Sequence, residues 1–95
     1  MIKVYLPSVL SKLCGGQTEV LLPFSVDAPT DISGVITRLD RDYPGVASRL
    51  LDDSGRLRRF VNIYNDGEDI RFLDELRTPV FNNSEVSVVP AVAGG

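Results

Sequence analysis

The sequence contains no histidine, no tryptophan and a single cysteine, Cys14, among its 95 residues. One thiol cannot form a disulfide within the chain, and a zinc cage cannot be built without imidazole or further thiolate groups. The absence of histidine also removes the usual general base for a serine or cysteine nucleophile, although carboxylates and lysines can take that role. The composition therefore argues against an enzyme and predicts no metal site within the chain.

Long apolar runs and an excess of positive charge are also missing. The apolar runs, such as residues 20–24, are far shorter than the roughly 20 residues that cross a bilayer, and the N-terminus lacks the pattern of a signal peptide. Ten basic residues stand against thirteen acidic ones, a formal net charge of -3, so nothing attracts a phosphate backbone over long distances. We therefore expect a cytoplasmic protein that binds neither membranes nor nucleic acids.

What is present is the composition of an ordinary globular domain, with 43% hydrophobic and 24% charged residues. The length suits one compact domain rather than two. No internal repeat, low-complexity tract or long linker divides the chain. We expect one folded domain over residues 1–90 and a flexible tail over residues 91–95.

The first part of the chain predicts two strands. Residues 2–6 alternate apolar and polar side chains before Pro7, as a strand does, and residues 19–26 read as a second strand that forms a hairpin with the first. The connecting residues, which include Cys14, are expected to form a loop. Pro23 suggests an edge position or a bulge for the second strand, because proline removes one ladder donor.

An amphipathic helix is predicted next, where Thr30 or Asp31 can cap its first turn. Apolar residues then recur at helical spacing, which places them along one face: Ile32, Val35, Ile36, Leu39 and Tyr43. Beyond this helix we predict a short helix over residues 46–51 and strands over residues 57–64, 70–72 and 85–89. This order of elements is typical of an α+β fold, in which one main helix covers one face of a sheet.

The last six residues have no charged and no large side chain: Pro90, Ala91, Val92, Ala93, Gly94 and Gly95. The two glycines lack a Cβ atom, so the backbone of another protein can close around this segment. A free carboxylate is a poor electrophile, and adenylation with ATP would give it a leaving group. We therefore expect the tail from Pro90 to Gly94 to thread into a partner that acts on the Gly95 carboxylate. A frayed terminus without function is the other interpretation of a Gly-Gly end.

Three segments carry a resemblance that extends over nearly the whole chain: residues 59–64, 69–72 and 85–95. Together with the order of predicted elements, they resemble the ThiS/MoaD family of ubiquitin-like sulfur carriers, and within it the carriers used in cysteine synthesis by actinobacteria. The resemblance implies a β-grasp fold, with a mixed sheet covered by one main helix and a flexible C-terminal Gly-Gly tail. Before the last strand many relatives have an Asp-Gly-Asp type turn, whereas residues 82–84 read Asn-Asn-Ser. Because asparagine tolerates the left-handed backbone region, we expect the turn to survive this change.

What the resemblance implies for function is a non-catalytic carrier that binds no cofactor of its own. An E1-like adenylating and sulfurtransferase enzyme would use ATP to activate Gly95 and convert it to a thiocarboxylate. A sulfur-accepting synthase would then take the sulfur; in the cysteine branch this is a cysteine synthase, and a metallopeptidase later releases cysteine from the carrier. Carried over residue by residue, Gly95 holds the reactive acyl group, Gly94 lets the tail pass, and Pro90 to Ala93 form the extended arm.

Two other functions stay open for the same tail. A ubiquitin-like modifier would use the activated glycine to form an isopeptide bond with a lysine, and a small subunit of molybdopterin synthase would keep its tail inside a partner. Lys3 and Lys12 are the only lysines, so chains built on this protein itself are disfavoured. The destination of the sulfur also stays open among cysteine, molybdopterin, thiazole and thiolated natural products.

Two further groups of polar residues have a functional and a plainer interpretation. Cys14 could hold sulfur as a persulfide, but it has no second thiol, so an unremarkable loop or partly buried cysteine is favoured. Arg56, Arg58 and Arg59 could dock in an acidic groove of an activating enzyme, but a short charge run beside a turn is usually a solvated face.

Four apolar residues could form an exposed patch for a partner: Phe60, Ile63, Tyr64 and Phe72. Alternation along a strand sends about half of its side chains inward. We therefore expect core packing for most of the four.

Overall fold

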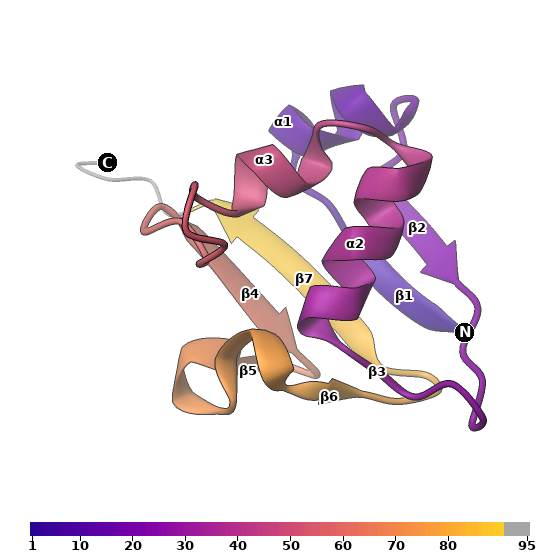
Figure 1. Cartoon of the computed structure of the whole chain (residues 1–95). Coiled ribbons are helices and arrows are strands. Elements are labelled where there is room, and N and C mark those ends of the chain that lie inside the picture. The colour runs from indigo at the N-terminus through magenta and orange to yellow at the C-terminus, as the bar shows by residue number, and fades with distance from the viewer. Residues whose placement is uncertain (91–95) are drawn as a thin grey trace.

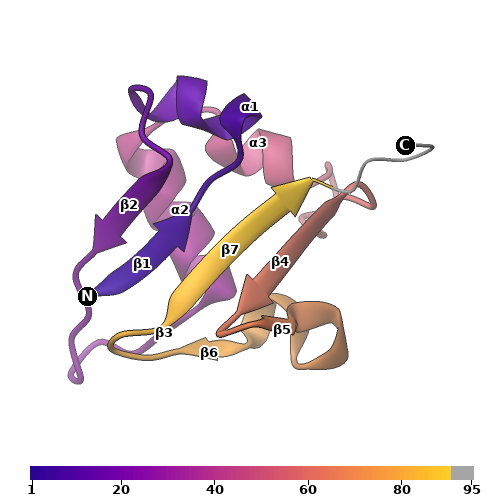
Figure 2. The same ribbon diagram turned by 180° about the vertical axis from the view of Figure 1, so that it is seen from behind.

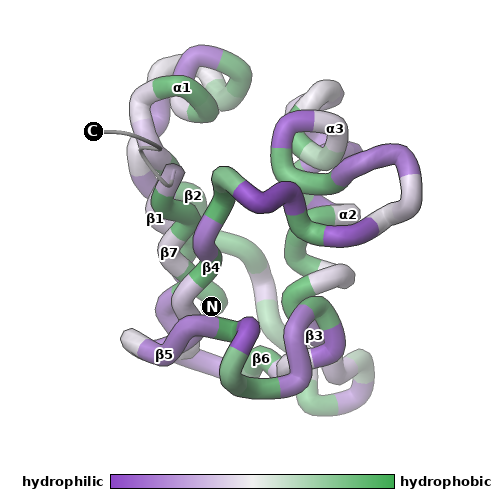
Figure 3. Tube along the Cα trace, turned by 90° about the vertical axis from the view of Figure 1, so that its left-hand side faces the viewer, coloured by the Kyte–Doolittle hydropathy of each residue, from purple (hydrophilic) through white to green (hydrophobic). Residues whose placement is uncertain are grey.

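The computed structural model describes residues 1–90, and residues 91–95, which include the predicted tail, lie outside the described part. It has two layers, a five-stranded sheet and, on one of its faces, the helices α2 (Ile32–Asp42) and α3 (Val46–Leu50), while α1 (Ser8–Ser11) lies at one end of the sheet (Figures 1 and 3). The strand order is β2 (Glu19–Leu22), β1 (Ile2–Tyr5), β7 (Glu85–Pro90), β4 (Val61–Asn65) and β5 (Glu68–Asp69). A separate short pairing joins β3 (Thr30–Asp31) to β6 (Pro79–Val80). The helical segments are α1 (Ser8–Ser11), α2 (Ile32–Asp42) and α3 (Val46–Leu50), and the 3₁₀ turns η1 (Lys12–Cys14), η2 (Ile70–Phe72) and η3 (Glu75–Arg77).

Strand β7 occupies the middle of the sheet, between the first strand of the chain and β4 (Figure 2). It runs parallel to β1 and antiparallel to β4. Val86 and Val88 point to the helical side of the sheet and are buried, while Val89 on the opposite side is partly exposed. The mixed sheet under one main helix confirms the predicted α+β class.

Helix α2 covers this sheet through the predicted apolar stripe. Ile32, Val35, Ile36 and Leu39 are buried, and Tyr43 follows the last turn half-buried. The side chain of Asp31 accepts a hydrogen bond of 2.8 Å from the backbone N–H of Gly34, which confirms the predicted N-cap. The helix is therefore specified both by its packing face and by its first turn.

The prediction of a loop after β1 was wrong, because α1 and η1 occupy residues 8–14. The carbonyl of Pro7 accepts hydrogen bonds from the backbone N–H groups of Leu10 and Ser11, and Gly15 ends the segment with a φ of 67°. A helix of four residues is too short to show an apolar period, so the pattern along the chain missed it.

The predicted strand over residues 19–26 was too long, since β2 ends at Leu22 and Pro23 follows the strand. Its edge position is confirmed, because β2 is the outermost strand beside β1. The strand predicted over residues 57–64 begins later, at Val61. Residues before it bond to the end of α3 instead: Leu57 forms a bridge with Leu51, and the N–H of Arg58 donates to the carbonyl of Leu50.

The strand predicted over residues 70–72 was also wrong, because these residues form the 3₁₀ turn η2. The Asp69 side chain accepts a hydrogen bond of 2.9 Å from the N–H of Arg71, which turns the chain out of the sheet. The β5 strand consists instead of the two residues before this turn. The short β3–β6 pair was not predicted, since two residues carry no alternation that a pattern could detect.

The predicted turn at residues 82–84 is confirmed with its special backbone. Asn83 has a φ of 70°, in the left-handed region that asparagine enters more easily than most residues. The hydroxyl of the buried Ser84 accepts a hydrogen bond from the N–H of Phe81. The departure from the Asp-Gly-Asp pattern is therefore accommodated without loss of the turn.

Among residues 1–90 no helix combines the length and the apolar character that a membrane span needs. Within the same residues no three side chains of the His, Cys, Asp and Glu types gather as metal ligands would.

Cys14 belongs to the core, which is a correction to the expected loop position. It is fully buried and ends η1, where it packs in the same cluster as Leu10 and Val46. Burial raises the pKa of its thiol, because the apolar surroundings disfavour the thiolate. The thiolate that nucleophilic sulfur chemistry needs is thus suppressed in the folded protein.

Helix α3 is held in place by a carboxylate from α2. Asp40 Oδ1 accepts hydrogen bonds of 3.1 Å from the N–H of Gly45 and 3.0 Å from the N–H of Ala47. The left-handed Gly45, with a φ of 107°, turns the chain so that both donors face this oxygen. Asp40 therefore satisfies the free N–H groups at the start of α3 although it lies on another helix.

We predict that Asp40→Ala lowers the free energy of unfolding by about 1–2 kcal/mol, because the partly buried N–H groups of Gly45 and Ala47 lose a charged acceptor. Urea unfolding followed by circular dichroism measures the change. The control is Asp42→Ala, which removes only an exposed carboxylate paired with Arg41. Equal unfolding midpoints for the two variants would contradict the role of Asp40.

We predict that Cys14 resists alkylation by iodoacetamide in the native protein and reacts fully in concentrated urea. Ser54→Cys, which adds a thiol at an exposed turn position, is the control that reacts in both conditions. The pKa of the Cys14 thiol is higher in the native protein than in the unfolded chain, so the unfolded chain loses this proton at a lower pH. The free energy of unfolding is therefore expected to fall as the pH rises through the alkaline range. Rapid native labelling of Cys14, detected by intact mass, would show that the thiol is accessible after all.

Candidate functional site

The candidate site lies where the central strand ends. Pro90 closes β7 and is paired with Val61 of β4, and the preceding Val89 is paired with Asn62. Pro90 is exposed and marks the start of the predicted tail. Ala91, Val92, Ala93, Gly94 and Gly95 lie outside the described residues, so their expected roles stay predictions.

An apolar groove of about 280 Å³ opens beside Pro90. Its walls come from α1 and the residue before it, the end of α3, the first residue of β4 and the last residues of β7, which meet at the same end of the sheet (Figures 1 and 2). Leu10, Leu50 and Val88 are its buried residues, while Val9 lies on its rim and is exposed. Among residues 1–90, Arg49 supplies the one charged side chain of the lining.

The strand beside Pro90 is braced from its other edge by Arg71. Strand β5 pairs only with Tyr64 and Asn65, so the first residues of β4 have no strand neighbour on that side. The Arg71 guanidinium takes this place: Nη1 donates to Asn62 Oδ1 at 2.7 Å, and Nη2 donates to the carbonyls of Val61 at 2.8 Å and Arg58 at 3.0 Å. Arg71 thus holds the β4 residues that pair with the end of β7.

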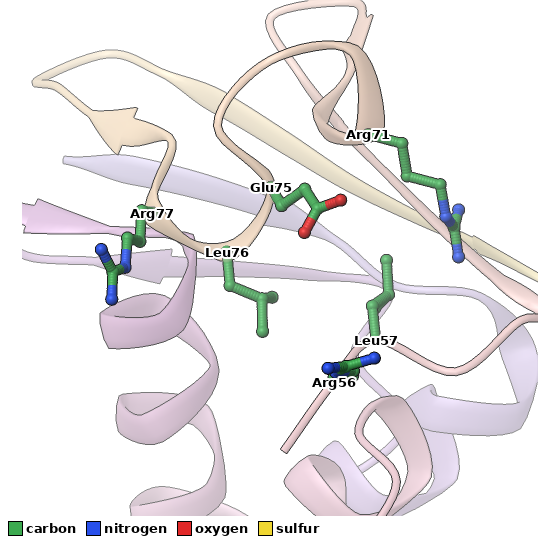
Figure 4. Close-up of a pocket in the computed structure, with 6 residues that line it drawn as sticks. All are labelled: Arg56, Leu57, Arg71, Glu75, Leu76 and Arg77. Atoms are coloured by element: carbon green, nitrogen blue, oxygen red, sulfur yellow. The ribbon is translucent and has the colours of Figure 1, made fainter. Parts of the chain in front are cut away.

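A larger cavity of about 440 Å³ lies between the segment before β4 and the two 3₁₀ turns after β5 (Figure 4). In Figure 4 the carboxylate of Glu75 points from η3 into the space between Arg71 and Leu57, and Arg77 points away from it. The Arg71 donors are already used by backbone and amide oxygens, so Arg71 acts at this cavity as a structural brace.

The three arginines singled out in the sequence make different contacts. The Nε of Arg58 donates to the carbonyl of Ser48 at 3.1 Å, which ties it to α3. Arg56 lines the cavity of Figure 4, and Arg59 is exposed. All three residues are exposed, as a solvated face predicts, and docking by this group stays a prediction.

The expectation that most of the four apolar residues pack in the core was wrong. Ile63 is buried and Tyr64 is half-buried, but Phe60 is 60% exposed and Phe72 is 88% exposed. Phe60 precedes β4 and Phe72 lies in η2, so neither residue is in a strand and alternation does not govern its side chain.

The groove beside Pro90 was not predicted from the sequence. Val9 lies on α1, a helix too short for a periodic pattern of apolar residues. Arg49 is one of eight arginines, and no motif in the sequence around it indicates a binding site. Pro7 before α1 and Gly15 after it were the available signals, because proline favours a helix start and glycine a left-handed end.

Comparison with known proteins shows similarity along the whole chain. The model of the ThiS family matches residues 16–95. The sulfur carrier protein CysO of Mycobacterium bovis is 42% identical over 97 residues, which cover 99% of this chain and 98% of that protein. The small archaeal modifier protein 3 of Haloferax volcanii is 36% identical over 80 residues, or 84% of each protein.

The structural comparison agrees with the sequence comparison. A chain of the Amycolatopsis orientalis BexX/CysO complex superposes with a TM-score of 0.87 and 28% identity, with 100% of both chains covered. This match confirms the β-grasp fold that the resemblance implied, and the similarity to CysO supports a sulfur-carrier role. Because the family model extends over most of the chain, this protein belongs to the ThiS family.

Proposed function

We propose that this protein carries sulfur as a thiocarboxylate on the C-terminal carbon of Gly95 and takes no catalytic part in the transfer. The observation that carries the proposal is the 42% identity to a sulfur carrier over nearly the full length of both chains. The fold agrees with this role, because β7 delivers the chain to the surface at Pro90, next to an edge braced by Arg71. The folded body then serves to present the tail.

The chemistry requires an activating partner, since a carboxylate has no leaving group. In the proposed sequence, a Gly95 carboxylate oxygen attacks the α-phosphorus of ATP and pyrophosphate leaves. A sulfide equivalent then attacks the acyl adenylate, AMP leaves, and the thiocarboxylate remains. Gly94 has no side chain to obstruct the channel, and the small residues from Ala91 to Ala93 form the arm that enters it.

The partners are accordingly an E1-like adenylating and sulfurtransferase enzyme and a sulfur-accepting synthase. The similar A. orientalis structure is a complex of CysO with a second protein, BexX, which supports a carrier that works in contact with a partner. For the cysteine branch the acceptor is a cysteine synthase that uses an activated serine, and a metallopeptidase then frees cysteine. ATP is a substrate of the activating enzyme in this scheme, and the carrier itself binds no cofactor.

A second candidate function is protein modification, which the similarity to a small archaeal modifier protein favours. The modifier would form an isopeptide bond between Gly95 and a lysine of another protein. The two functions share the adenylate and differ in the nucleophile that takes the acyl group. The fate of Gly95 therefore separates them.

We predict that the full chain, incubated with ATP, sulfide and the activating enzyme from the same cells, gains the sulfur-for-oxygen mass difference. Intact-mass spectrometry measures the gain, and removal of Gly95 or addition of one alanine after it should abolish it. An alanine added before Met1 is the matched control and should leave the reaction unchanged. Conjugates of higher mass that isopeptidases cleave, formed without any thiocarboxylate, would favour the modifier instead.

A further inference from the structure

The length of the tail limits how far a partner can stay from the folded body. Five residues follow Pro90, and at about 3.3–3.6 Å each they span at most roughly 18 Å. An enzyme that encloses the Gly95 carbonyl must therefore cover the surface around Pro90. The groove beside Pro90 lies inside that footprint.

The groove has the size and lining of a side-chain pocket. Its volume of about 280 Å³ is below the roughly 300–1,000 Å³ typical of small-molecule sites. Leu10, Leu50 and Val88 present apolar walls, and Val9 on the rim is 59% exposed although it is a β-branched apolar residue. An apolar side chain placed here would cover Val9 and remove this surface from water.

The positive charge of Arg49 in the lining of the groove favours an occupant with a negatively charged group. Within residues 1–90, the Arg49 guanidinium takes part in neither of the two ion pairs, and its side chain donates no hydrogen bond. The protein as a whole carries a net charge of -3, so Arg49 is a positive group on a mostly acidic molecule. A carboxylate beside the apolar side chain of the occupant would pair with it.

We propose that this groove is a docking site for the activating enzyme, which inserts an apolar side chain flanked by a carboxylate. The inference rests on the proposed function, because the activating enzyme that this function requires must reach Gly95 and is thereby brought against this surface. The groove would supply affinity through the folded body, while the tail supplies the reacting group. Binding and chemistry are then carried by separate parts of the molecule.

The test measures thiocarboxylate formation by the purified activating enzyme at a series of carrier concentrations, with the full chain throughout. Val9→Asp should raise KM about tenfold, because a charge replaces apolar surface that the bound enzyme would bury, and leave kcat within about twofold. The matched control is Val26→Asp, since Val26 is a valine that is 82% exposed and lies outside the groove. Thermal unfolding by circular dichroism checks that both variants fold.

The charge is tested separately. Arg49→Glu should raise KM several-fold, Arg49→Lys should restore most of the affinity, and Arg41→Glu is the control at another exposed arginine. An unchanged KM for Arg49→Glu would overturn the carboxylate contact.

The remaining outcomes identify other occupants. Equal KM values for Val9→Asp and Val26→Asp would overturn docking in the groove. A lower KM for Val9→Asp would mean that the chain's own tail occupies it, and loss of a dimer in sedimentation with unchanged KM would mean that a second copy does. If the unsubstituted protein itself gains no sulfur, both the proposed function and this inference are wrong. Equal KM values for Val9→Asp and Val26→Asp, with sulfur still gained, would contradict only the inference.

Discussion

The position of β7 between β1 and β4 is the constraint on which the rest of the structure depends. A strand in the middle of a sheet has its backbone bonded on both sides, and here Val86 and Val88 are also buried beneath the helices. Moving such a strand would expose backbone groups and apolar surface together, so its course is fixed. Because β7 ends at Pro90, the fold determines the point from which the tail starts.

The surroundings of that point are reinforced from both sides. Arg71 binds the carbonyl of Val61, the residue that pairs with Pro90, and so replaces a missing strand neighbour. On the helical side, Asp40 fixes the start of α3, whose last residues form part of the groove. The polar contacts of Arg71 and those of Asp40 thus converge on the end of the sheet where Pro90 lies.

The sequence predicts the elements that have a repeated pattern of apolar residues. It does not predict elements whose conformation depends on a single hydrogen bond. The α2 helix was predictable, because its stripe extends from Ile32 to Tyr43 and its cap is adjacent. Residues 70–72 have strand composition, but one hydrogen bond to the Asp69 side chain turns them into η2. The groove depends on α1, which has only four residues and no detectable period. The tail was predicted from its composition and from family resemblance. Residues 91–95 lie outside the described residues, so their roles stay predictions.

The chemistry of a Gly-Gly end also explains why the folded body should matter for partner choice. Two glycines offer an enzyme only backbone atoms and a carboxylate, so they contain no side chain by which one carrier can be told from another. Discrimination must then come from residues that the same enzyme touches within the reach of the tail. Val9 and Arg49 lie there, next to Pro90, and they combine apolar surface with one charge. A carrier built in this way can keep a uniform reactive end while its folded body determines which enzyme binds it.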